Sequence, residues 1–201
     1  MKKPKSPLIL ASNSPRRSIL LNQINLKFTV IPARIREEIL NNERPADYVK
    51  RIALKKGEKV ASEYPERTVI AADTIVVLKD KILGKPKNQK KAKEMLKELR
   101  GKEHKVITGV SVINKSKNKT LCRSIETSVK MKPFSNEKID GYVKTKEPLD
   151  KAGGYGIQER GAILVDNIKG SYTNVVGLPL EALWEMLKET GLEPWQMNYP
   201  L

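Results

Sequence analysis

The sequence predicts an α/β fold with a mixed β-sheet, and three observations lead to this prediction. Short apolar runs are followed by helix-length amphipathic segments near both ends of the chain. Between them, residues 105–113 and 120–131 alternate in polarity or carry β-branched side chains, and the polar residues 115–119 join them as a hairpin. Parallel βα units at both ends with a hairpin between them give strands of mixed direction.

In the N-terminal half, proline marks the start of each expected helix. Pro15 follows a strand that begins at Leu8, and Pro45 begins a helix that ends near Tyr64. The proline ring fixes a backbone angle that suits the first helical position, where the missing N–H has no partner to lose. The remaining elements expected here are strands at 27–32 and 68–78, a charged loop at 33–44, and a turn and a loop at 79–86.

In the C-terminal half, capping residues mark the helices. Asn88 and Ser135 are expected N-caps, because their side chains can accept a hydrogen bond from the first helical turn. Gly101 ends the first of these helices, and the second reaches about residue 145. The elements expected beyond it are a glycine-rich segment at 150–161, a strand at 162–168 and a last helix from 179 to 191.

The composition predicts one domain in a reducing compartment. At 201 residues the chain is long enough for one full core, so we expect one domain over residues 1–201. The single cysteine, Cys122, permits no internal disulfide. No signal peptide and no apolar run of membrane-spanning length are apparent. We therefore expect a cytoplasmic protein with no membrane partner.

The formal net charge of +16 raises the alternative of a nucleic-acid partner. The lysines, however, are spread over most of the expected surfaces. No basic block is interleaved with aromatic residues, as a stacking platform for bases would require. A generally lysine-rich surface is the favoured interpretation, so nucleic acid is not the expected partner. The excess charge still attracts small anionic substrates.

The segment between the first strand and the first helix is typical of a phosphate site. Ser12 lies among the small polar residues that end the strand, and the free N–H groups at a helix N-terminus favour anions. Arg16 and Arg17 add planar, permanently charged groups suited to phosphate oxygens. Their charges oppose the helix dipole, so helix stability does not explain them. An ordinary capped helix with solvated arginines is the alternative.

Asp73 interrupts the otherwise apolar strand at 68–78. Burying a carboxylate there is costly unless the group is paired or binds a metal. A strand interior is also a rigid support for a reacting group, so Asp73 is a candidate catalytic residue. Thr74 follows on the opposite face if the strand is regular. A structural aspartate bonded to backbone N–H groups is the alternative.

Two lysines and the glycine-rich segment extend the candidate anion site. Lys56 falls on the apolar stripe of its helix, a position from which lysines usually reach solvent. Lys85 lies in a Gly-Lys-Pro sequence, which restricts the backbone around a compact positive charge. The segment 150–161 contains three glycines in four positions, followed by Gln158. The amide of Gln158 can both donate to and accept from the edge of a base.

The candidate metal ligands are oxygen atoms. With one histidine and one cysteine, the chain offers no ordinary zinc site and no Ser-His-Asp or Cys-His nucleophile. His104 follows a helix in a polar segment, and we expect it at the surface. Carboxylates, lysines and arginines remain, a set typical of Mg²⁺-assisted chemistry on phosphates. Glu37 and Glu38 are candidates to join Asp73 at the metal.

Taken together, these motifs resemble the Maf-like family of nucleoside triphosphate pyrophosphatases. The resemblance spans about residues 8–187, nearly the whole chain, and each motif is weak alone. Their joint order carries the resemblance: Leu-Ala-Ser-Asn-Ser-Pro-Arg-Arg, Ala-Ala-Asp-Thr-Ile-Val, Gly-Lys-Pro, Glu-Thr at 126–127, Asp-Lys-Ala-Gly-Gly-Tyr-Gly-Ile-Gln, and Val-Val-Gly-Leu-Pro at 175–179.

The resemblance implies hydrolysis of dTTP and UTP to the monophosphate and pyrophosphate with a divalent cation, Mg²⁺ or Mn²⁺, and a role in removing modified pyrimidine nucleotides. It implies that Asp73 is the proton acceptor that activates water. It also implies that Arg16, Thr74 and Gln158 select the nucleotide. The implied fold is an elongated mixed sheet with flanking helices and two lobes around a substrate cleft, similar to inosine triphosphate pyrophosphatases. A homodimer is also implied.

Our hypothesis from the sequence combines the residues and the resemblance. The expected triphosphate ligands are Arg16, Arg17, Lys56 and Lys85, and the expected metal ligands are Asp73 and Glu37. The family usually has Ile-Asp-Glu where this chain has Ile35-Arg36-Glu37, so a cation replaces one acid. Three alternatives stay open: the same chemistry on 7-methyl-GTP or another purine nucleotide, a regulator of septum formation that binds nucleotide or a protein partner, and a nucleic-acid binder.

Overall fold

A computed structural model describes residues 7–194 of the chain. Seven strands form one sheet in the order β2-β1-β3-β5-β6-β7, with β4 paired to β3. The strands are β1 (Leu8–Leu10), β2 (Phe28–Val30), β3 (Thr68–Leu78), β4 (Lys81–Leu83), β5 (Glu103–Asn114), β6 (Lys119–Met131) and β7 (Val165–Lys169). The α-helices are α1 (Pro15–Gln23), α2 (Pro45–Glu63), α3 (Gln89–Leu99), α4 (Asn136–Lys144), α5 (Tyr172–Val176) and α6 (Leu180–Glu189). Three short 3₁₀ helices, η1 (Glu147–Asp150), η2 (Ala152–Gly154) and η3 (Arg160–Leu164), lie between α4 and β7.

The strand directions confirm a mixed α/β sheet. Strand β1 pairs in parallel with both β2 and β3, as the N-terminal βα units predict. Strand β4 is antiparallel to β3, and β7 is antiparallel to β6. The expectation of a parallel βα unit at the C-terminal end is therefore wrong for β7. Within residues 7–194, no helix combines the length and the apolar character that crossing a membrane requires.

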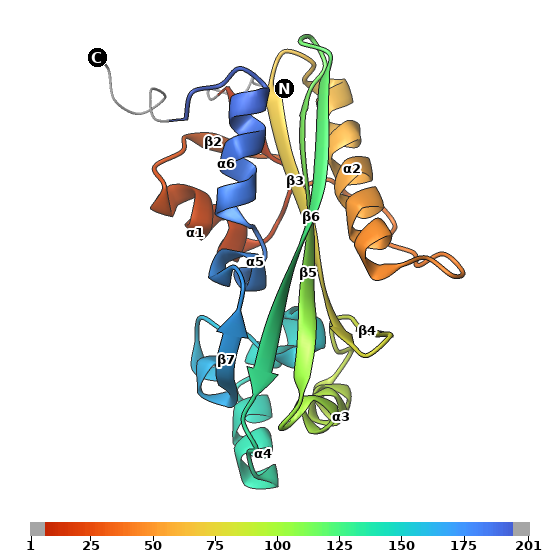
Figure 1. Cartoon of the computed structure of the whole chain (residues 1–201), viewed down its shortest axis with the longest axis vertical. Helices are drawn as coiled ribbons and strands as arrows, with labels where there is room; N and C mark the ends of the chain where they lie inside the picture. Colours follow the sequence, from red (N-terminus) through yellow and green to blue (C-terminus); the bar gives the residue numbers. More distant parts are fainter. Residues whose placement is uncertain (1–6, 195–201) are drawn as a thin grey trace. The chain divides into compact units, whose positions relative to one another are not determined.

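Contacts divide the chain into two compact units. The first contains residues up to 73, residues 108–125 and residues from 177 onward. In this unit α2 lies on one face of the strands, whereas α1 and α6 lie on the other (Figure 1). A buried cluster packs α2 against β1, β3 and β5: Ile9, Ala11, Val60, Ala61, Val69, Ala71 and Ile113.

Helix α2 approaches β5 closely because a glycine faces it. A Cβ atom added at Gly109 would lie 2.2 Å from the carbonyl oxygen of Val49, so no larger residue fits there without displacing the helix. Two residues along β5, Ser111 Oγ donates to the carbonyl oxygen of Ala53 at 2.8 Å. These contacts fix the height of α2 above the sheet.

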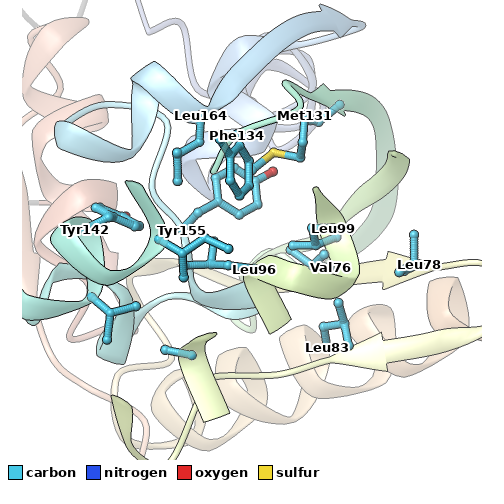
Figure 2. Packing of buried hydrophobic residues seen from close by; sticks show 14 of the residues in the cluster. Val76, Leu78, Leu83, Leu96, Leu99, Met131, Phe134, Tyr142, Tyr155 and Leu164 are labelled. Atoms are coloured by element: carbon cyan, nitrogen blue, oxygen red, sulfur yellow. The ribbon is translucent and has the colours of Figure 1, made fainter. Parts of the chain in front are cut away.

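The second unit contains residues 74–107 and 126–176. Its core gathers side chains from β3, β4, α3, β5, β6 and α4, together with residues between α4 and β7. In Figure 2, Phe134, Tyr155, Met131 and Leu164 pack close together, and Leu96 and Leu99 of α3 lie beside them. Tyr155 brings the glycine-rich segment into this core, with 5% of its surface exposed.

Local signals predicted most helix boundaries. Pro15 and Pro45 begin α1 and α2, and the side chains of Asn88 and Ser135 accept hydrogen bonds from the first turns of α3 and α4. The expected loop at 79–86 instead contains β4, because Leu83 pairs opposite Val76 and is buried. The expected strand at 162–168 begins only at residue 165, after η3.

Candidate active site

The carboxylate of Asp73 lies inside the first unit on the face that α2 covers. Val69, Ala71 and Asp73 are two residues apart along β3, so their side chains point to the same face of the sheet. Val69 and Ala71 belong to the buried cluster beneath α2. Only 6% of the residue is exposed. A charged group so deeply placed in a strand needs a partner, and the adjacent helix supplies one.

Lys56 of α2 bridges two carboxylates. Its Nζ donates to Asp73 Oδ1 at 2.8 Å and lies 2.7 Å from Glu37 Oε1. The side chains of Lys56 and Asp73 are 10% and 9% exposed, whereas that of Glu37 is 45% exposed. Lys56 therefore does not reach open solvent from the apolar stripe, as most lysines in such positions do. It joins a buried acid to an accessible one.

The loop that carries Glu37 is held against α2 by basic side chains. Arg51 donates from Nε and Nη2 to the two carboxylate oxygens of Glu43, each at 2.6 Å. Lys59 Nζ donates to the carbonyl oxygen of Arg34 at 2.5 Å. Since Lys56 lies between these two residues on the same helix, the loop is tied on both sides of Glu37.

Arg17 is buried, and its guanidinium holds the backbone together around the site. Its Nε donates to the carbonyl oxygen of Gly177 at 2.8 Å. Its Nη1 donates to Ser12 Oγ at 3.0 Å and to the carbonyl oxygen of Ala72 at 2.8 Å. The alternative of solvated arginines is wrong for this residue. These two nitrogens act within the chain, whereas our sequence hypothesis assigned Arg17 to the triphosphate.

The electrostatic environment links Arg17 to the acids. Burial lowers the pKa of Arg17, while the charges of Asp73 and Glu37 raise it and that of Arg16 lowers it. An arginine remains protonated through such a shift. The site therefore contains two interior cations, Arg17 and Lys56, beside Asp73 and Glu37.

Tyr48 is a residue of the site that the sequence analysis missed. It is 6% exposed, and burial raises its pKa to about 12, with further raising by the charges of Asp73 and Glu37. It occupies the first turns of α2, eight positions before Lys56 in the sequence. Positions four apart share a helix face, so Tyr48 lies on the same apolar stripe of α2 as Lys56. This spacing was the sequence signal that could have identified Tyr48.

The remaining predicted site residues differ in their exposure and in the unit to which they belong. Thr74 follows Asp73 in β3 and is half-buried, and Arg16 is half-buried in the first turn of α1. Lys85 and Gln158 are exposed residues of the second unit. Ser12 is 8% exposed and accepts hydrogen bonds from Arg17 and from the N–H of Ser14.

His104 corrects a prediction. We expected it at the surface, but it is 3% exposed, and its Nε2 lies 2.7 Å from Tyr155 Oη. Burial lowers the pKa of His104 to about 4. The polar neighbours of His104 in the sequence concealed its position: Glu103 and Lys105 are exposed, whereas His104 between them points to the buried face of β5.

Residues 7–190 match a family model described as Maf-like protein. The chain belongs to this family. A dTTP/UTP pyrophosphatase of Clostridioides difficile (strain 630) is 49% identical over 182 residues, which cover 90% of this Maf-like chain and 94% of that protein.

A second relative has the same name. A dTTP/UTP pyrophosphatase of Dictyoglomus turgidum (strain DSM 6724 / Z-1310) is 50% identical over 186 residues, covering 92% of this Maf-like chain and 96% of that protein. The solved structure of a HAM1 protein from Coxiella burnetii is 14% identical, has a TM-score of 0.48, and covers 90% of this chain and 98% of that one.

The donor set of this Maf-like protein suits a hard divalent cation. Among residues 7–194 no three histidine, cysteine, aspartate or glutamate side chains converge as a complete metal cage. Asp73 and Glu37 nevertheless share one lysine, so their oxygens lie near each other. Mg²⁺ is usually held by one or two carboxylates together with substrate phosphates and water, so this pair fits it.

Proposed function

We propose that this Maf-like protein hydrolyses dTTP and UTP to the nucleoside monophosphate and pyrophosphate. The observation that carries the proposal is a buried carboxylate, Asp73, held by Lys56 and flanked by the interior guanidinium of Arg17. A buried acid beside fixed cations suits the activation of water next to a polyanion. The names of relatives at 49% and 50% identity support the choice of substrate.

In the proposed reaction a water oxygen forms a bond to the α-phosphorus and the bond from that phosphorus to the bridging β-phosphate oxygen breaks. Asp73 takes the proton from the attacking water, and the electron pair of the broken bond leaves on pyrophosphate. Lys56 has three N–H donors and uses two on the acids, so the third can reach a phosphate oxygen. Positive charge already in place needs no rearrangement in the transition state.

A divalent cation, Mg²⁺ or Mn²⁺, would supply neutralisation of the triphosphate charge when bound. A carboxylate that ligates a metal tightly is a poor base, so we assign ligation chiefly to the accessible Glu37 and the proton to Asp73. Arg36 beside Glu37 replaces the acid that the family usually carries there. We favour Glu37 over Glu38 as the ligand, because Glu37 shares Lys56 with Asp73. We further propose that Arg16, Thr74, Lys85 and Gln158 contact the nucleotide, and that the protein is a cytoplasmic homodimer.

The test mixes the purified protein with dTTP, UTP, 7-methyl-GTP and ITP in competition, with Mg²⁺ or Mn²⁺ and with chelator, and measures each nucleoside monophosphate formed together with pyrophosphate. We expect dTTP and UTP to be preferred by at least about tenfold, and chelation to abolish the reaction. A preference for either purine nucleotide would overturn the substrate assignment. Release of inorganic phosphate in place of pyrophosphate would overturn the reaction itself.

A further inference from the structure

Glu147 lies outside the candidate active site, and its carboxylate accepts hydrogen bonds from backbone N–H groups of the glycine-rich segment. Its Oε2 accepts from the N–H of Arg160, and its Oε1 accepts from the N–H of Gly161, each at 3.2 Å. These are the first two residues of η3. Glu147 thereby ties the end of the segment back to η1, in which it is the first residue.

Tyr142 of α4 closes the other end of the same segment. Its hydroxyl donates to Glu147 Oε1 at 2.9 Å and accepts from the N–H of Gly156 at 3.1 Å. Burial raises the pKa of Tyr142, so the hydroxyl keeps the proton that it donates to Glu147. Gly156 and Arg160 are thus both anchored through one tyrosine–glutamate pair.

The anchored segment has no spare volume. A Cβ atom added at Gly161 would lie 2.3 Å from the carbonyl oxygen of Gly156 and 2.6 Å from Tyr142 Oη. One added at Gly156 would lie 2.5 Å from Cε of Lys151. Just before these residues, Tyr155 is buried in the core of the second unit against His104. The path of the backbone is therefore determined on both sides.

Gln158 is the exposed midpoint between the two anchors. It lies two residues after Gly156 and two before Arg160, so its backbone has little freedom while both N–H groups stay bonded. A loop with fixed ends loses little conformational entropy when it binds a ligand. We propose that Tyr142 and Glu147 are positioning residues that hold Gln158 ready to contact the nucleotide base. This inference rests on the proposed function, in which Gln158 contacts the nucleotide.

The experiment uses Tyr142→Phe, which removes one oxygen, and Glu147→Gln, which keeps the side-chain shape but loses one acceptor. Matched controls are Tyr172→Phe, an exposed tyrosine of α5, and Glu159→Gln, which removes the charge of an exposed residue in the same segment. Amide hydrogen exchange at Gly156, Arg160 and Gly161 measures the anchoring, and thermal unfolding verifies that each variant folds. If Glu147→Gln does not fold, Tyr142→Phe still decides the question.

We expect faster exchange at these amides in both variants and a rise of about tenfold in KM for dTTP and UTP, with kcat changed less than about threefold. Inhibition by inorganic tripolyphosphate, which lacks a base, should be unchanged. If the two residues had a merely structural role, the variants would unfold at a lower temperature. The ratio between the KM for the nucleotide and the inhibition constant for tripolyphosphate would then equal that of wild type.

Two failures are distinguishable. This inference alone is overturned if the wild-type protein is active but the Tyr142→Phe and Glu147→Gln variants keep the wild-type KM. It is also overturned if the three amides exchange as slowly in the variants as in wild type. Wild-type protein that releases no pyrophosphate from dTTP or UTP overturns the proposed function, and the positioning role with it.

Discussion

Lys56 neutralises Asp73 in a part of the first unit where both side chains are at most 10% exposed. Replacing the ammonium by an apolar group leaves a buried carboxylate without compensation, a change that costs about 3–5 kcal/mol in comparable pairs. We expect Lys56→Met to lower the free energy of unfolding by about that amount in urea titrations. Adding Asp73→Asn removes the orphaned charge and should restore part of the loss. Additive costs in the double variant would contradict the pairing.

His104 makes stability depend on pH. Its pKa is about 4 in the folded chain, below the ordinary value of 6.5, because burial disfavours the charged ring. The folded state therefore binds fewer protons than the unfolded state between these values. The stability contributed by neutral His104 is complete above about pH 6.5 and is lost as pH falls toward 4, by roughly 3 kcal/mol.

We expect His104→Gln to flatten this pH dependence in thermal unfolding between about pH 6.5 and 4.5, where most carboxylates remain charged. The chain has one histidine, so no other imidazole contributes to the difference. Equal slopes for the variant and the wild type would show that the ring is not buried as a neutral group.

At the scale of elements, the distance between α2 and β5 decides where Lys56 lies. Gly109→Ala places a methyl group 2.2 Å from the carbonyl oxygen of Val49, so the helix must shift. We expect a loss of about 3 kcal/mol in stability, in the range of overpacked cores. We also expect at least a tenfold loss of pyrophosphate release, because Lys56 moves with its helix.

Gly141→Ala is the matched control for this prediction. Gly141 lies within α4, and an added Cβ atom would meet nothing within 4 Å. Alanine should stabilise the helix by about 0.5–1 kcal/mol and leave activity as in wild type. If both alanine variants behave alike, the close approach of α2 to β5 is not what positions Lys56.

Elements with local chemical signals were predictable from the sequence. Proline at the first helical position and Asn88 or Ser135 as caps identified four helices, because these signals act within one turn. Strand β4 has three residues, which give little periodicity, although its partner β3 is adjacent in the sequence. The direction of β7 depends on β6, a partner distant in the sequence. The same limit applies to η3, whose start depends on Glu147.

Two residues of the candidate site, Asp73 and Lys56, could be identified from the sequence. Asp73 and Lys56 each break an apolar pattern, and such a break indicates that another group compensates the charge. The internal role of Arg17 was not predictable, because its acceptors are carbonyl oxygens that no side-chain pattern encodes. His104 was missed because its burial follows from the packing of whole elements. Tyr48 could have been found, because it lies on the same helix stripe as Lys56.

At the scale of the whole molecule, the net charge of +16 should accelerate capture of an anionic nucleotide. We expect kcat/KM for dTTP to fall several-fold as KCl rises from about 50 to about 500 mM, with kcat nearly constant, because salt screens attraction at a distance. A nonionic osmolyte at matched osmolarity is the control. If kcat/KM does not depend on salt, the surface charge has no role in substrate capture.

The catalytic role of Asp73 is tested most directly by product analysis of dTTP hydrolysis with wild-type protein and the Asp73→Asn variant. We predict that wild type yields dTMP and pyrophosphate in equal amounts. The variant should still bind dTTP but should release pyrophosphate at least about 100-fold more slowly, because the loss of a preorganised reacting group costs about that factor in rate. Turnover by the folded Asn variant at the wild-type rate would contradict the account.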